Sequence, residues 1–412
     1  MAAPASNGER PWADLPLEMV EAVVEHLDLF STTRLAAVCT SWATAVAMIA
    51  SLPFGMPCLL MTSEEDDAYG VRRDDYDEWT FQLMAFTRER VVSFPALISN
   101  EWWQWWVGAK DDWLATVDEH GYAQLLNPYT CHQIDLPDIT SFPDFKIRDR
   151  FSRIVVCETP SDTGDDGYLV IAKDTTGLLA IARGGDENWT PLRDPWDHLF
   201  GYTDAVVHKG KVFAIDTSGS IYAWDIRDGA CPEPENVKPP HVDRDEFTHH
   251  WRLAESADGR RLLIVCIYGK LVECRRFSTY YDHLEYLTFA AEGVRLYERD
   301  MDGAAGSDSD EGWSPVTSLG DHSLFLGANY PFFARVDQGS SDSSWHRLRP
   351  NCIYFTDNQL HRCKDLDEDV EVFDLGAEKY PYSSMKLFWS DRYYSYQTPI
   401  WFRPMLKNYD LE

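Results

Sequence analysis

Apolar residues near the start of the chain recur with the period of a helix. Within residues 13–30 the apolar positions are spaced by three, four and three residues. On a helix, this spacing places them on one face. The pattern predicts a helix from about Asp14, with Pro16 in its first turn. Its apolar stripe consists of Leu17, Val20, Val24 and Leu27, with Val23 beside them.

A second helical pattern follows directly. Ser31 is a favourable N-cap, and Phe30 with Leu35 match the positions of a hydrophobic staple. The stripe then runs on without a break and places Cys39 mid-helix as inert packing. Its members are Leu35, Val38, Cys39, Trp42, Val46 and Ile49. About 40 residues are too few to bury a core of their own, so we expect this unit to pack on the rest of the chain or on another protein.

After Pro53 the helical period ends, and short apolar segments between turn residues predict β-strands. Three segments share the order strand, Asp-x-x-Gly turn, strand, at residues 113–126, 168–182 and 211–224. Aspartate opens such turns by binding its own backbone, and glycine supplies the positive φ. Further hairpins are predicted at residues 260–274 and 351–363.

Strand hairpins that recur every 40–50 residues or so without helices are typical of propeller blades. The turn aspartates are 56 (174 − 118) and 42 (216 − 174) residues apart, and the 337 residues from 76 to 412 divide into about six to eight blades. A two-sheet sandwich is the competing architecture, although its natural size is smaller. The sequence leaves open whether the strand near Ile400 or the one near Cys58 closes the ring.

The predicted fold is therefore a small all-α domain followed by a large all-β domain, a β-propeller. Residues 1–11 are expected to be a flexible tail and 12–50 the helical domain. Residues 51–78 are interpreted as a linker with a candidate first strand, and 79–412 as the propeller. An acidic, glycine-rich loop at 301–312 is expected to be a disordered insertion.

The net charge and the cysteine pattern limit the partners and the cellular compartment that we expect. The formal net charge is −31, which disfavours nucleic acid and anionic membranes as partners. Nine scattered cysteines form no C-x-x-C pair and indicate free thiols in a reducing compartment. The chain lacks a secretory signal pattern and an apolar run of about 20 residues. We expect a soluble protein of the cytoplasm and/or nucleus.

Candidate chemistry is sparse. Five tryptophans in residues 101–113 suggest a sugar or single-strand stacking platform, but packing between blades explains them better. His249 and His250 have no third ligand at a recognisable spacing, so we expect solvent-facing or capping histidines and no metal. Nucleophile-elbow, phosphate-loop and zinc-protease motifs are absent, which predicts neither an enzyme nor a cofactor. Ser307 and Ser309 are candidate phosphorylation sites in the acidic loop.

The segment LPLEMVEAVVEHLDLFSTTRLAAVCTSW (15–42) resembles the F-box, although Thr40 and Ala43 replace residues that are often basic. The resemblance implies docking on the Skp-type adaptor of a cullin-based ubiquitin ligase, and an amphipathic helix is a common way to fill a partner's groove. Which side chains face the adaptor and which join the helices stays open. The candidate adaptor-binding residues are Leu15, Pro16, Leu17, Val20, Val23, Leu27, Leu35, Val38, Cys39 and Trp42.

Four later phrases, LLNPYTCHQIDLP, YTDAVVHKGKVFAID, WSPVTSLGDHSLFLG and NCIYFTDN, resemble the KIB-type β-propeller of plant F-box proteins. This resemblance implies the substrate-recognition subunit of an SCF-type ligase, whose propeller binds an unidentified target protein. The alternatives are a scaffold that recruits no ligase and a propeller that binds or hydrolyses sugar.

Overall fold

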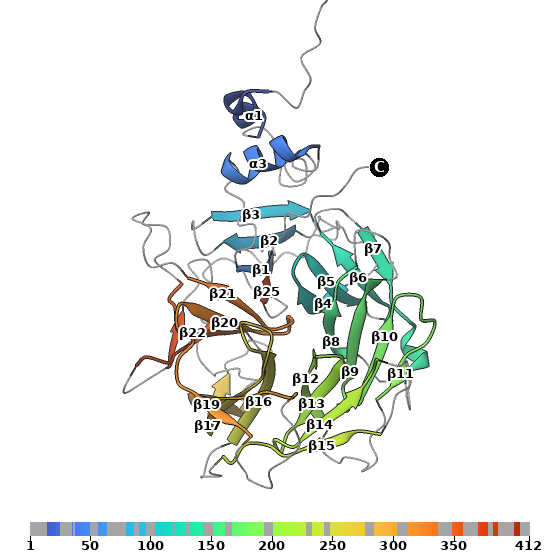
Figure 1. The fold of residues 1–412 in the computed structure, drawn as a ribbon, viewed down its shortest axis with the longest axis vertical. Helices are drawn as coiled ribbons and strands as arrows, with labels where there is room; N and C mark the ends of the chain where they lie inside the picture. Colours follow the sequence, from blue (N-terminus) through green and yellow to red (C-terminus); the bar gives the residue numbers. More distant parts are fainter. Residues whose placement is uncertain are drawn as a thin grey trace, which may run out of the picture.

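Most of the described chain is β-structure, arranged as sheets around a common centre (Figure 1). The computed structural model describes residues 15–24, 35, 38–49, 57–63, 80–85, 90–95, 104–118, 120–128, 132–142, 151–160, 167–192, 201–227, 233–242, 248–276, 284–302, 312–336, 348–356, 370–377, 382–385 and 399–403. Within these residues the strands form six sheets, five with four strands and one with five.

The first three sheets are antiparallel, with register shifts in the β4–β5 and β8–β9 pairs. One has the order β25-β1-β2-β3, formed by Ile400–Phe402, Cys58–Ser63, Thr80–Ala85 and Arg90–Pro95. The next has the order β4-β5-β6-β7, formed by Gln104–Lys110, Trp113–Asp118, Ala123–Asn127 and His132–Asp135, and a short 3₁₀ helix, Ile139–Ser141, follows it. The third has the order β11-β10-β9-β8, formed by Thr190–Pro191, Leu179–Arg183, Leu169–Asp174 and Phe151–Glu158.

The other three sheets complete the ring. One has the order β12-β13-β14-β15, formed by Tyr202–His208, Lys211–Asp216, Ile221–Asp225 and Glu235–Val237. Another has the order β16-β17-β18-β19, formed by Thr248–Glu255, Leu262–Arg276, Leu284–Arg299 and Ser314–Val316. The last has the order β21-β20-β22-β23-β24, formed by Phe332–Arg335, His322–Gly327, Cys352–Thr356, Val370–Asp374 and Tyr382–Met385.

Neighbouring sheets bury their faces against each other, which explains why the middle strands are mostly apolar. All six residues of β5 are buried. One apolar cluster joins β5 and β6 to β8–β10, and another joins β9 and β10 to β13, β14 and β16. Among the fully buried side chains, Trp224 and Trp401 are the largest.

Both candidate closing strands take part in closing the ring. β25, near the end of the chain, pairs antiparallel with β1, near its start, so that Leu60 lies opposite Ile400. β1 also pairs with β2. The sheet that joins the two ends of the propeller therefore takes its inner strand from the C-terminal side and its other three from the N-terminal side.

The three predicted Asp-x-x-Gly turns are confirmed in atomic detail. In the turn between β9 and β10, Asp174 Oδ1 accepts the backbone N–H groups of Thr176 (2.9 Å) and Leu178 (2.8 Å). Gly177 adopts a φ of +89°, which residues with a side chain rarely adopt. The same contacts recur around Asp118 and Asp216. Because each turn links the second and third strands of its sheet, all three turns lie at one end of the ring, which we call the turn end.

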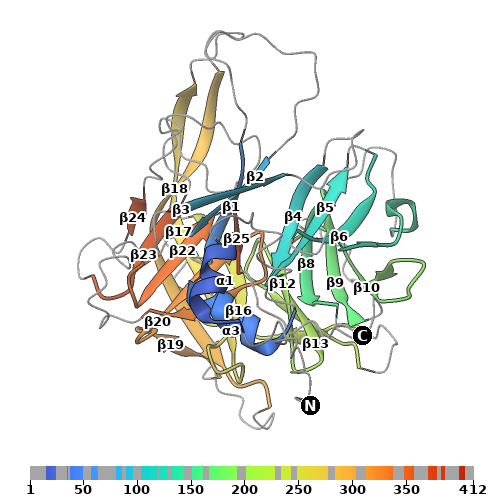
Figure 2. The same cartoon turned by 90° about the horizontal axis from the view of Figure 1, so that it is seen from above.

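The predicted hairpin at residues 260–274 is wrong. Leu262–Arg276 is the continuous strand β17, and Gly269 marks a register shift against β18 instead of a turn. Glycine is common at such bulges because it tolerates the local distortion. Figure 2 shows the long β17–β18 hairpin projecting beyond the other sheets. Of the predicted hairpin at 351–363, β22 is present, and residues 357–363 lie outside the described part.

The five-stranded sheet departs from the simple meander, because β20 pairs in parallel with β22. The segment between β20 and β21 crosses the centre of the ring. Asn329 forms a bridge with Ala109 of β4, and the Tyr330 hydroxyl donates to the Val207 carbonyl of β12 at 3.0 Å. This segment fills part of the central channel with buried side chains.

Candidate functional site

Two short helices lie at the edge of the ring beside β3 (Figure 1). Helix α1 spans Leu17–Val24 and α3 spans Thr40–Ile49. The Pro16 carbonyl accepts N–H groups at the start of α1, from Met19 at 2.9 Å and Val20 at 3.2 Å. The residues between the helices are described only in part, so a complete helical domain at 12–50 stays a prediction.

The two helices contact each other, and the apolar residues on and just before them fall into two sets. Val20 of α1 and Val46 of α3 are buried. Met19, Val23 and Val38 are instead exposed by 55%, 42% and 49% of their surfaces. We call these three residues, two on α1 and one just before α3, the exposed apolar face. Sequence reasoning missed Met19, although its spacing from Val23 places both on one side of a helix.

The other predicted adaptor-binding residues differ in how far they are buried. Pro16 is exposed, and Leu15, Leu35, Cys39 and Trp42 are half-buried. The backbone of Leu17 belongs to α1 while its side chain is not described, and Leu27 lies outside the described residues.

The predicted uninterrupted second helix is wrong at Cys39. Val38 lies in a bend, Cys39 has no regular structure, and α3 begins at the next residue. The Cys39 carbonyl accepts the N–H of Ala43 at 2.8 Å, and its Sγ accepts the N–H of Trp42 at 3.5 Å. Cys39 therefore caps α3 instead of lying mid-helix, because apolar spacing alone does not reveal where a helix begins.

At the turn end, a cavity of about 270 Å³ lies beside the Asp216 turn. The His249 ring stacks on Trp251, with ring centroids 5.8 Å apart and planes inclined by 21°. Trp251 in turn packs against Gly219, where a Cβ would lie 2.8 Å from the indole. The lining residues are Thr217, Ser218, Gly219, Pro239, Pro240, Val242, Thr248, His249 and Trp251. The cavity combines an aromatic wall with hydroxyl groups.

Both histidine side chains are half-buried, so the expected solvent-facing or capping role stays a prediction. Burial, with the nearby Arg252 guanidinium and then His249, lowers the pKa of His250 to about 4. His250 is therefore neutral at pH 7. Within the described part of the chain, no group of three or more His, Cys, Asp or Glu residues lies close enough to hold a metal ion.

A cluster of charged residues, three buried and one half-buried, lies near the turn end of the central channel. It consists of Arg153 on β8, Lys173 on β9, Asp204 on β12 and Arg252 on β16, and we call it the channel mouth. Arg153 Nη1 lies 2.8 Å from Asp204 Oδ1. The Arg252 guanidinium donates to the Trp251 carbonyl at 2.9 Å and lies 5.7 Å from the centre of the Phe355 ring.

The cations of the channel mouth repel one another. Burial, and then the charges of Arg153 and Arg252, lower the pKa of Lys173 to about 8, against the opposing effect of Asp204 and Asp174. Burial also lowers the pKa of Arg252 to about 10, with Asp204 opposing and Arg153 adding to the effect. The folded protein therefore holds these charges under electrostatic strain at neutral pH.

This strain predicts a pH dependence of stability. Between pH 8 and 10.5 the unfolded chain binds the Lys173 proton more often than the folded chain, so stability should rise with pH in this window. Relative to the variant Lys173→Met, the wild type should gain about 2 kcal/mol of unfolding free energy between pH 7 and pH 10. Urea unfolding of both proteins at each pH measures the difference. A wild type that loses stability relative to the variant over this range would show that Lys173 is not repelled.

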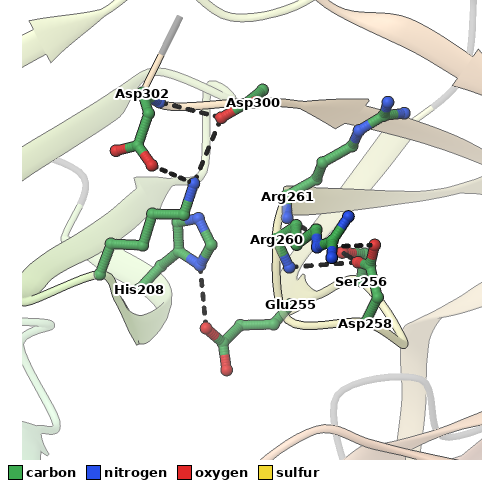
Figure 3. Close-up of polar contacts among 9 residues, drawn as sticks. His208, Glu255, Ser256, Asp258, Arg260, Arg261, Asp300 and Asp302 are labelled. Atoms are coloured by element: carbon green, nitrogen blue, oxygen red, sulfur yellow. Dashed lines mark hydrogen bonds and ion pairs between the residues drawn. The ribbon is translucent and has the colours of Figure 1, made fainter.

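Figure 3 shows polar contacts at the opposite end of the ring. His208 Nδ1 lies 2.9 Å from Glu255 Oε1, and Lys209 donates to Asp302 at 2.6 Å and to Asp300 at 3.2 Å. Ser256 donates to Asp258 at 2.6 Å, not to a histidine. These contacts comprise the buried His208 with Glu255, turn contacts and surface ion pairs, without the nucleophile and base pairing of an acyl-transfer site.

The described tryptophans of the 101–113 block support packing over a stacking platform. Trp106 and Trp113 are buried, and Trp113 belongs to the apolar cluster between the second and third sheets. Trp102 and Trp103 lie outside the described residues, and the side chain of Trp105 is not described. A sugar-binding surface would need exposed rings, which these two tryptophans do not offer.

The remaining sequence predictions concern modification, redox state and membranes. Ser307 and Ser309 lie outside the described residues. The described cysteines are free thiols, and burial raises the pKa of Cys157 to about 12, so this thiol is unreactive at neutral pH. Among the described helices, none has the length and apolar character needed to cross a bilayer.

Comparison with known proteins adds two domain matches. Residues 87–374 match the family described as KIB1-4 beta-propeller, and residues 12–52 match the F-box domain. An F-box generally implies binding to a Skp-type adaptor.

Two plant relatives extend over most of the chain. The putative F-box protein At4g17565 of Arabidopsis thaliana is 22% identical over 84% of this chain and 83% of its own length. F-box protein SKIP23 of the same plant is 22% identical over 92% of this chain and 94% of its own length. Among solved structures, YCF48 from Cyanidioschyzon merolae aligns with a TM-score of 0.29 and 8% identity, over 52% of this chain and 74% of its own. A structural likeness this distant supports no conclusion about function.

Proposed function

Since the chain belongs to the KIB1-4 beta-propeller family and carries an F-box, we propose that it is the substrate-recognition subunit of a cullin-based, SCF-type ubiquitin ligase. In this role the helices dock on a Skp-type adaptor, and the propeller binds a target protein. The free thiols among the described cysteines suit a reducing compartment, the cytoplasm and/or the nucleus.

The exposed apolar face carries the proposal. Met19, Val23 and Val38 lie within the segment that matches the F-box, and large apolar side chains at this exposure suit contact with a partner. Val20 and Val46 are buried, so they join the helices instead of facing the adaptor. We therefore assign adaptor contact to the exposed apolar face and to Pro16.

For the propeller we propose six blades, one for each sheet of the described residues. Inner strands of successive sheets contact each other around the channel, from β25 to β4, β8, β12 and β16, and β20 contacts β25. We place the boundary of the helical domain between Ile49 and Cys58, because β1 already belongs to the ring. The target should bind at the turn end, which carries the cavity and the channel mouth.

Such a subunit does no bond chemistry. It holds the target's lysines near the ubiquitin-loaded enzyme and converts a bimolecular encounter into a nearly intramolecular one. The protein's contribution is therefore two binding surfaces on one chain.

Adaptor binding is tested by co-expression with a plant Skp-type adaptor and a pull-down. We expect the wild type to recover the adaptor and a cullin, and the double variant Met19→Asp/Val23→Asp to recover more than tenfold less. Placing carboxylates where apolar anchors are buried on binding should remove at least about 1–2 kcal/mol of binding free energy each.

The matched control is Leu178→Asp, which introduces the same charge at an exposed apolar residue of the propeller (37% exposed). It should bind the adaptor like the wild type. Recovery of the adaptor without a cullin would favour a scaffold over a ligase subunit. Equal recovery by the double variant would exclude the exposed apolar face as the docking surface.

A further inference from the structure

Two cations face each other across neighbouring strands at the channel mouth. Arg153 of β8 and Lys173 of β9 are direct partners in the antiparallel register. Directly opposite residues point to the same face, and like charges in this arrangement are destabilising. Arg153 is buried and Lys173 half-buried in a protein whose net charge is −31, so acidic residues were not scarce as partners.

The nearby carboxylates are already engaged. Asp204 accepts from Arg153, from the Ala205 N–H at 2.9 Å and from the Leu253 N–H at 2.9 Å. Asp174 accepts the N–H groups of its own turn and the Thr176 hydroxyl. Neither aspartate is therefore available as a full counter-ion for a second cation.

Lys173 is left with a weak contact. Its Nζ reaches the Thr203 carbonyl at 3.5 Å, and among the described residues no carboxylate lies within 4.0 Å of it. Arg153 Nε is also buried without a hydrogen-bond partner within the described part of the chain. Arg153 Nη2 donates to the Asn329 carbonyl at 3.3 Å, which leaves Arg153 Nε and the weakly bound Lys173 ammonium as donors with spare capacity.

We propose that the channel mouth is a binding site for an oxyanion, a phosphate or carboxylate group, held by Lys173 with Arg153 and Arg252 around it. An anion here would neutralise the repulsion between the facing cations and accept charge-assisted hydrogen bonds. Lys173, Thr203 and His250 are half-buried, so the site is open to solvent on this side. The oxyanion is either a free ion or a group carried on a peptide. That the peptide belongs to a ligase target rests on the proposed function, whereas the site itself does not.

The experiment measures thermal unfolding of the purified full chain in 10 mM inorganic phosphate, 10 mM acetate or chloride alone, all at equal ionic strength. A second arm titrates a short peptide whose only charged side chain is one phosphoserine, and calorimetry follows the binding. The wild type should melt about 2–4 °C higher with a bound oxyanion than in chloride. A response to the free ions indicates a free ligand, and binding of the peptide alone indicates a group carried on a partner.

The variant Lys173→Met keeps the apolar stem and removes the charge. We expect it to melt at or above the wild-type temperature in chloride and to lose the response to oxyanions. The control Lys211→Met removes a cation that is paired with Glu235 on the surface, and it should respond like the wild type. If neither the ions nor the peptide act, or if Lys173→Met responds as strongly as the wild type, the proposal is overturned. Adaptor recovery is measured separately, so the two proposals fail independently.

Discussion

Replacing Asp204 with alanine is expected to lower the free energy of unfolding by about 3–5 kcal/mol. The carboxylate is buried and accepts one charged and two backbone donors, from Arg153, Ala205 and Leu253. Without it, the cations of the channel mouth lose the carboxylate that lies among them. Breaking a buried ion pair from one side is costly because the remaining charge stays buried. Urea unfolding followed by tryptophan fluorescence measures the loss.

The control is Asp225→Ala, at the end of β14 in the same sheet, which removes a surface ion pair with Arg227. Exposed pairs contribute little, so this variant should unfold near the wild-type midpoint. A double variant, Asp204→Ala/Arg153→Met, should be less destabilised than the sum of the single changes, because the uncompensated charge is removed with its partner. Additive losses would mean that Asp204 acts only through its backbone contacts.

The sequence predicted the features that depend on contacts between residues close together in the chain. The Asp-x-x-Gly turns are correct because aspartate binds N–H groups two and four residues away and glycine supplies the positive φ. The propeller followed because several such hairpins recur along the chain. Each of these inferences uses contacts that close within a single hairpin.

The features that the sequence did not predict depend on contacts between distant residues, or on a pattern that fits two structures. The parallel pairing of β20 with β22 leaves no signal in the sequence of either strand. The apolar period placed Cys39 inside a helix, because the position of Cys39 in that period fits both a helix interior and a cap. The channel mouth was missed because its members lie on four strands far apart in the sequence. A signal was present, since Arg153 and Lys173 place cations beside the apolar runs of their strands, residues 154–157 and 169–172.

The inner strands β4 and β8 approach each other so closely at Gly108 that a side chain there should destabilise the protein. Gly108 of β4 faces the backbone of β8, and a Cβ built on it would lie 1.8 Å from the Ile154 carbonyl oxygen. No real contact is this short, and a backbone atom of a neighbouring sheet cannot rotate away as a side chain can. Gly108→Ala should therefore force β4 and β8 apart and lower the free energy of unfolding by about 3 kcal/mol.

A matched glycine separates this clash from a general effect of adding a methyl group. At Gly376 the nearest atoms to a new Cβ lie at 3.4 Å, an ordinary contact, and its φ is not positive. Gly376→Ala should leave stability unchanged or slightly higher, since alanine has less freedom to lose on folding. Unfolding of both variants in urea provides the comparison. A Gly108→Ala protein as stable as Gly376→Ala would mean that the inner strands are not packed backbone to backbone at this point, and that the ring tolerates looser contact between its second and third sheets.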